Sequence, residues 1–122
     1  MIIAVDFDGT CVTHQYPDIG RAIGAMPVLA DLVKAGHKII LYTMRSGLEL
    51  DYAVNWLKFQ GIPLYGINEN PGQEQWTSSR KVYADLYIDD AALGIPLKQY
   101  PNERPCVDWL AVKRLLIDRG IL

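Results

Sequence analysis

The sequence predicts an α/β fold in which helices on both faces enclose a central parallel β-sheet, a three-layer α/β/α sandwich. Short apolar runs at Ile2–Val5, Ile39–Tyr42 and Ala84–Ile88 alternate with longer segments of helical periodicity. Each run is continuous rather than alternating, as in strands that are buried on both faces. The first and last runs are followed at once by aspartates, at the strand ends where open parallel sheets bind ligands.

Length and composition limit what the chain can be. Its 122 residues are near the commonest domain size, so we expect one domain over residues 1–122. The net charge of −2 offers no basic surface for nucleic acid. No apolar run approaches the roughly 20 residues that span a bilayer. Two cysteines and no recognisable secretory leader predict a protein of the reducing cytoplasm.

The first half of the chain reads as strand, helix, strand. After the strand Ile2–Val5 and a loop with Pro and Gly punctuation, apolar residues at helical spacing predict a helix from about Gly24. Pro27 suits its first turn and Gly36 its end. The strand Ile39–Tyr42 follows, so a right-handed parallel unit is expected.

A second helix is predicted from near Leu48 to Phe59, with an inward face that includes Leu50, Ala53, Val54, Leu57 and Lys58. The residues 62–67 then predict a third strand, which Pro63 and Gly66 would confine to an edge of the sheet.

The last part of the chain predicts one strand, a surface loop and one helix. The strand Ala84–Ile88 is followed by a proline-rich stretch, residues 96–105, that reads as loop. A helix is predicted from about Val107 to Arg119, stopped by Gly120. We expect its buried side to be formed by Leu110, Leu115 and Leu116.

Polar side chains follow three of the predicted strands. Asp6 and Asp8 follow the first, Thr43 the second, and Asp89 with Asp90 the last. Because the carboxyl ends of parallel strands meet at one edge, these groups should lie together. Crowded carboxylates repel one another unless a cation relieves them, and hard oxygen ligands suit Mg²⁺. We expect such a site to bind a phosphate group. The nearby Cys11 is interpreted as a packing residue.

These motifs resemble those of the haloacid dehalogenase superfamily, in its phosphatase branch. The segment Asp6-Phe7-Asp8-Gly9-Thr10 matches the first motif, Thr43 the second, and Asp89-Asp90 the fourth. The resemblance extends from Ile2 to about Ala92 and implies a Rossmann-like sheet. No stretch is long enough for the cap domain that many members carry, so a capless form with an open site is implied.

The resemblance implies a role for each matched residue. Asp6 would attack phosphorus and form an aspartyl-phosphate, and Asp8 would act as general acid and then base. Thr43 and a lysine would stabilise the transferring group. Mg²⁺ would be bound by Asp6, the backbone carbonyl of Asp8, Asp89, and Asp90 directly or through water. The third motif matches least well: Lys81 is the favoured residue, with Arg80 or a more distant base as alternatives.

Three further residues are candidates for contact with the substrate. Thr10 offers a hydroxyl but can also hold the turn after the first strand. His14 can reach a ligand from its loop or be solvated. Arg45 can bind a distal anion of the substrate or be a solvated loop charge. An open site suits a phosphorylated small molecule, a phosphorylated macromolecule, or closure by a second copy of the chain.

Other functions fit part of the pattern. A response-regulator receiver domain also places acids, a threonine and a lysine around Mg²⁺, but its phosphorylated aspartate follows a middle strand, where this chain has Asn68 and Asn70. A phosphate-binding or scaffold protein with slow turnover would keep the same residues. Transfer of phosphate to an acceptor other than water is a third alternative, which the missing cap disfavours.

Overall fold

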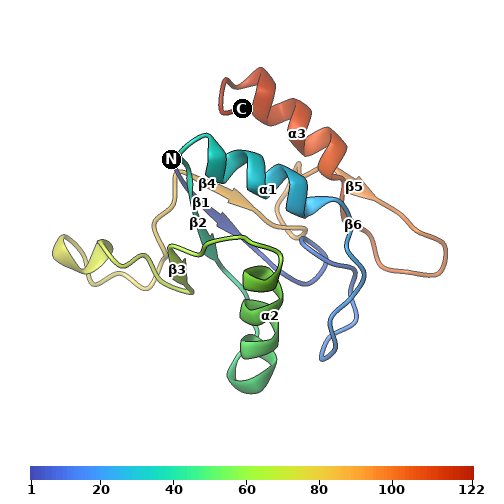
Figure 1. The fold of residues 1–122 in the computed structure, drawn as a ribbon, viewed down its shortest axis with the longest axis horizontal. Helices are drawn as coiled ribbons and strands as arrows, with labels where there is room; N and C mark the ends of the chain where they lie inside the picture. Colours follow the sequence, from blue (N-terminus) through green and yellow to red (C-terminus); the bar gives the residue numbers. More distant parts are fainter.

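The computed structural model describes residues 1–122, and its centre is a four-stranded parallel sheet in the order β3-β2-β1-β4 (Figure 1). The strands of this sheet are β1 (Ile2–Val5), β2 (Lys38–Leu41), β3 (Gly66–Ile67) and β4 (Leu86–Ile88). The helices are α1 (Ala25–Lys34), α2 (Gly47–Phe59), α3 (Trp109–Asp118) and the short 3₁₀ helix η1 (Gln73–Gln75). None of them is long and apolar enough to cross a membrane.

The register of the sheet brings three strand ends to one level. Val5 of β1 pairs with Leu41 of β2 on one side and with Ile88 of β4 on the other. The residues that follow these three, including Asp6 and Asp89, therefore leave the sheet side by side at its carboxyl edge. This confirms the prediction of a parallel α/β sheet, and β3 is at an edge as Pro63 and Gly66 predicted.

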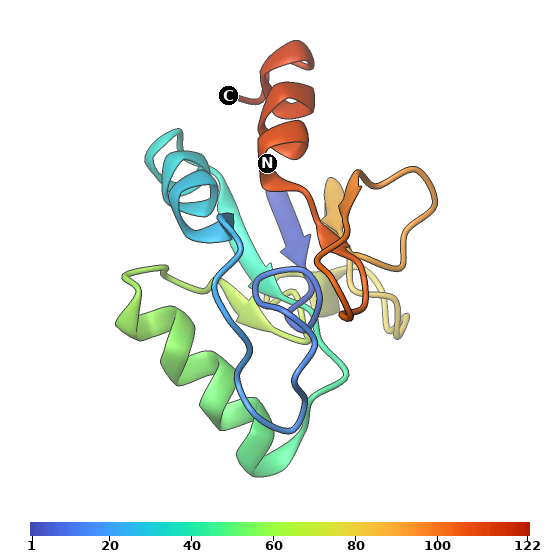
Figure 2. The same ribbon diagram turned by 90° about the vertical axis from the view of Figure 1, so that its right-hand side faces the viewer.

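All three α-helices pack on one face of the sheet. Alternate strand residues such as Val5, Leu41 and Ile88 point into a single core with side chains from every helix. The helical members of this core are Ala25, Val28, Leu29, Leu32, Ala53, Val54, Leu57, Trp109, Val112 and Leu116. Figure 2 shows α1 and α2 on one side of the strands and the yellow segment after β3 on the other.

The expectation of a three-layer sandwich is therefore not confirmed at its third layer. The opposite face, with Ala4 and Ile40, is covered by Val82 and Ala84 of the irregular segment that joins β3 to β4. Right-handed crossovers from β1 to β2 to β3 place α1 and α2 on the same face. The return from β3 to β4 runs across the other face, and its turn-rich residues 68–72 form no α-helix.

The buried side of α3 also differs from the prediction. Leu110 is 75% exposed and Leu115 43% exposed, whereas Trp109, Val112 and Leu116 are buried. Asp108 caps the helix by accepting a hydrogen bond from the Ala111 N–H, so the buried stripe begins at Trp109. The helix has apolar residues on several sides, and their spacing alone did not identify the stripe that faces the sheet.

The proline-rich stretch and the two residues after it contain an antiparallel pair of strands that the sequence did not predict. Its strands are β5 (Leu97–Lys98) and β6 (Cys106–Val107), and both residues of β6 are fully buried. The Val107 N–H donates a hydrogen bond to the Gly9 carbonyl at 2.9 Å. This contact fixes the loop after β1 against the C-terminal part of the chain.

Candidate metal centre

Three carboxylates meet at the carboxyl edge of the sheet. Asp6 follows β1, Asp89 and Asp90 follow the neighbouring β4, and one oxygen from each lies within 4.8 Å of the others. Octahedral Mg²⁺ holds oxygens at about 2.1 Å, so opposite ligands lie roughly 4.2 Å apart. Small side-chain movements would bring these three oxygens onto one ion, and a set of carboxylate oxygens is the donor type that Mg²⁺ prefers.

The electrostatics of the cluster also call for a cation. Burial, the charge of Asp89 and a hydrogen bond with Asp90 together raise the pKa of Asp6 to about 8. Without a cation, Asp6 is therefore largely protonated at neutral pH and is a poor nucleophile. A divalent ion among the three carboxylates would restore the charged form.

Thr10 is a buried link within the cluster rather than an open substrate contact. It is fully buried, its hydroxyl donates to Asp6 Oδ2 at 2.9 Å, and it accepts a hydrogen bond from the Asp90 N–H at 3.0 Å. The Trp109 indole N–H donates to the Thr10 carbonyl at 2.6 Å. This burial does not support the predicted substrate contact, and Thr10 instead joins the ends of β1 and β4.

His14 lies against the cluster. Its Nε2 is 3.0 Å from Asp90 Oδ2, so the loop after β1 folds back over the acidic residues. Gly9 permits this approach, because its φ is +79° and a Cβ there would collide with the His14 ring and the Asp90 carboxylate. His14 is thus placed to orient Asp90, as outer partners of metal ligands commonly do.

Asp8 points away from the cluster and pairs with Arg45. The Arg45 Nε and Nη2 atoms donate to the two Asp8 carboxylate oxygens at 2.8 and 2.7 Å. The remaining N–H groups of Arg45 bond the carbonyls of Pro17, Asp18 and Glu49. All five donors of the guanidinium are thereby occupied.

Arg45 therefore fits neither of its two predicted roles. It is 3% exposed, so it is not a solvated loop charge, and it has no N–H group left for a substrate anion. Its guanidinium also stacks 5.0 Å from the Phe7 ring centroid and 5.2 Å from that of Tyr16. The Asp8 carboxylate is committed to this ion pair, which leaves its backbone carbonyl as the group available to a metal.

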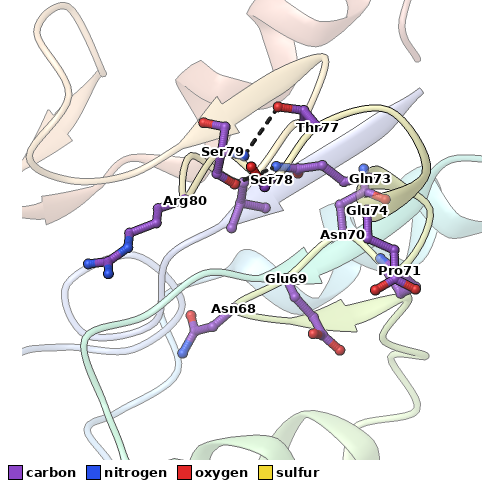
Figure 3. A pocket seen from close by; sticks show the side chains of 11 residues that line it. Asn68, Glu69, Asn70, Pro71, Gln73, Glu74, Thr77, Ser78, Ser79 and Arg80 are labelled. Carbon is purple, nitrogen blue, oxygen red and sulfur yellow. Dashed lines mark hydrogen bonds between the residues drawn. The ribbon is translucent and has the colours of Figure 1, made fainter.

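The predicted phosphate-stabilising residues have different surroundings, and none of them bonds the carboxylates of the acidic cluster. Thr43 follows β2, and its hydroxyl accepts a hydrogen bond from the backbone N–H of Arg45 at 3.2 Å. The Lys81 ammonium is 5.8 Å from the centre of the Tyr87 ring and forms no ion pair. Arg80, the alternative, lines a pocket beside the same edge of the sheet (Figure 3).

Two residues of the site were missed by sequence reasoning. Asn68 accepts a hydrogen bond from the Thr43 N–H at 2.8 Å, and Trp109 holds the Thr10 carbonyl. Asn68 has a φ of +54°, and its turn-rich surroundings were the signal for an unusual backbone. For Trp109 the sequence carried no signal, because its partner lies at the other end of the chain.

The fold and site together define an α/β protein whose parallel sheet has, at its carboxyl edge, a cluster of three carboxylates that could hold a metal ion. No protein-family model and no curated protein matches the chain. Among solved structures, a conserved protein from Bacteroides thetaiotaomicron shares 38% sequence identity and superposes with a TM-score of 0.82. The match covers 98% of this chain and 91% of that one. The chain belongs to the family of this Bacteroides protein.

Proposed function

We propose that the chain is a Mg²⁺-dependent phosphomonoesterase of the haloacid dehalogenase type, acting through an aspartyl-phosphate on Asp6. The observation that carries this proposal is the convergence of Asp6, Asp89 and Asp90, with oxygens within 4.8 Å of one another, at the end of the central strands. Residues 6–10 resemble the first motif of that superfamily, and this resemblance implies that Asp6 is the nucleophile.

Each residue has a place in the proposed reaction. The Asp6 carboxylate attacks phosphorus, and the bond to the ester oxygen breaks. Asp8 would give a proton to that departing oxygen and then take one from the water that hydrolyses the aspartyl-phosphate, which requires its carboxyl group to leave the ion pair with Arg45. Arg45 orients Asp8, and Thr43 lies at the neighbouring strand end to hold the phosphoryl oxygens. Mg²⁺, bound by Asp6, Asp89 and Asp90, would neutralise charge that develops on the phosphoryl group.

Hydrolysis of an aryl phosphate tests the proposal. Phosphate release by the wild type should require Mg²⁺, and Asp6→Asn should reduce kcat by several orders of magnitude because it removes the nucleophile. Asp51→Asn, an exposed change on α2, is the matched control and should keep wild-type activity. Equal activity of Asp6→Asn and wild type would exclude the proposed mechanism.

Asp8→Asn separates chemistry from metal binding. We expect kcat to fall by about 10² to 10⁴, the usual contribution of a general acid or base. Mg²⁺ affinity, measured by calorimetry, should stay close to wild type, because only the backbone carbonyl of Asp8 is available to the ion. A large loss of Mg²⁺ affinity would contradict this division of roles.

A further inference from the structure

A polar pocket of about 430 Å³ lies in the segment that joins β3 to β4. It is lined by 11 residues, of which one is hydrophobic. The lining residues are Asn68, Glu69, Asn70, Pro71, Gln73, Glu74, Thr77, Ser78, Ser79, Arg80 and Val82 (Figure 3). None of them belongs to the acidic cluster, so the metal centre does not account for this pocket.

The pocket adjoins the proposed site of phosphate transfer. Asn68 follows β3, donates its N–H to the Leu41 carbonyl at 2.8 Å, and accepts the Thr43 N–H through its side chain at 2.8 Å. Side chains alternate along a strand, so Asp6 leaves β1 on the same face as Ala4. That is the face on which Val82 and Ala84 of the β3–β4 segment pack against Ala4 and Ile40.

The walls of the pocket are held in place by two buried amides. The Gln73 side chain donates to the carbonyls of Ser79 and Lys81 at 3.0 and 2.7 Å and accepts from the Tyr83 N–H at 2.7 Å. The Asn70 side chain donates to the Tyr83 carbonyl and accepts from the Gly72 N–H, each at 3.0 Å. An irregular segment without such contacts would lose more conformational entropy when a ligand binds.

The lining groups select the chemistry of the ligand. Amides and hydroxyls predominate, and Pro71 and Val82 are the apolar side chains, so the pocket suits a ligand rich in hydroxyl groups. Figure 3 shows Asn68 and Arg80 at one end and Glu74 at the other. The positively charged Arg80 thus lies at the end of the pocket where Asn68 is hydrogen-bonded to Thr43. The carboxylates of Glu69 and Glu74 would repel a second anionic group of the ligand.

We propose that this pocket binds the leaving group of the substrate, and that this group is a neutral sugar or polyol. The substrate class is therefore a sugar or polyol monophosphate rather than a bisphosphate or a phosphorylated acid. This inference rests on the proposed phosphatase function. Arg80 lies where it would face the phosphate of a ligand that extends from Asp6 into the pocket.

The first test compares glucose 6-phosphate, fructose 1,6-bisphosphate and phenyl phosphate as substrates. For the wild type, kcat/KM should be at least about tenfold higher for glucose 6-phosphate than for the bisphosphate. The double variant Glu69→Gln, Glu74→Gln should narrow this ratio about three- to tenfold, with phenyl phosphate hydrolysis as the reference rate. The control Asp51→Asn, Asp118→Asn changes two exposed acids on α2 and α3 and should not alter the ratio. An unchanged ratio in the pocket variant would overturn the proposal.

The second test does not depend on turnover. Glucose 6-phosphate and free glucose are titrated into ¹⁵N-labelled Asp6→Asn protein with Mg²⁺, and amide shifts are followed by NMR. Shifts at the Gln73 and Asn70 side-chain amides and at Ser78 support the pocket even if no hydrolysis is found. Hydrolysis by the wild type without shifts in the pocket would leave the phosphatase function standing and overturn the leaving-group site.

Discussion

At the scale of single residues, Arg45 holds together parts of the site that come from separate segments. It pairs with Asp8 after β1 and bonds the carbonyls of Pro17 and Asp18 in the following loop and of Glu49 in α2. The planar guanidinium can make these five bonds in fixed directions, whereas a lysine ammonium has three donors at one point. Arg45 therefore positions Asp8 and has no N–H group left for a ligand.

Replacing Arg45 should cost both stability and activity. Arg45→Lys and Arg45→Gln remove donors from the carbonyls of Pro17, Asp18 and Glu49 and release Asp8 from a buried ion pair, so we expect a loss of about 2–4 kcal/mol in the free energy of unfolding. We also expect kcat for an aryl phosphate to fall more than tenfold, with a shifted pH profile. Urea unfolding and steady-state kinetics measure the two effects.

The matched control for Arg45 is Arg21, whose ion pair with Glu103 is on the surface. Its side chain is 60% exposed, so Arg21→Lys should change the unfolding free energy by less than about 0.5 kcal/mol. Arg45→Lys with wild-type stability and wild-type kcat would show that the buried guanidinium does not position Asp8.

At the scale of elements, α3 supports the site through its first residue. Trp109 is buried, and its indole N–H fixes the Thr10 carbonyl, so packing of the last helix determines the conformation of the loop after β1. Thr10 in turn bonds Asp6 and Asp90. A helix far from β1 in sequence thus contributes to the arrangement of the metal ligands.

Two leucine substitutions test which side of α3 faces the sheet. Leu116→Ala removes a side chain that is 3% exposed and should lower the unfolding free energy by about 2–5 kcal/mol, because it leaves a cavity. Leu110→Ala changes a side chain that is 75% exposed and should stay within about 0.5 kcal/mol of wild type. Chemical denaturation of both variants gives the comparison; equal losses would contradict the observed helix orientation.

At the scale of the whole molecule, the acidic cluster links stability to pH and metal. The native pKa of Asp6 is raised from 3.8 to about 8, so between these values the native state binds more protons than the unfolded state. Stability from this group is present at low pH and is lost as pH rises towards 8. We expect the melting temperature of the metal-free protein to fall between pH 5 and pH 8.

If the cluster binds Mg²⁺ as proposed, the ion should oppose this fall, because it would bind the deprotonated carboxylates of the native state. The rise in melting temperature on adding Mg²⁺ should therefore be larger at pH 8 than at pH 5. Asp6→Asn removes the titrating group and should flatten the pH dependence of the metal-free protein. Scanning fluorimetry at several pH values measures the melting temperature with and without Mg²⁺. If the melting temperature of metal-free Asp6→Asn falls with pH as steeply as that of the wild type, Asp6 is not the source of the pH dependence.

The placement of the candidate metal ligands followed from the sequence alone. Continuous apolar runs identified β1, β2 and β4, and the parallel crossovers required their carboxyl ends to share an edge. Asp6 and Asp89, which come directly after strands, and the next residue Asp90 were therefore expected at one edge, and the pairing of β4 with β1 brings them together. Local pattern and chain order suffice for this prediction, since neither depends on how distant side chains pack.

Tertiary structure alone decided what the remaining polar residues do. The sequence allowed Arg45 and Thr10 to face a substrate, but both are buried in contacts with residues far along the chain. It also predicted helices on both faces, whereas the β3–β4 segment forms an irregular layer braced by Gln73. Hydrogen bonds and burial between distant segments arise only when the elements pack, and periodicity along the chain does not encode them.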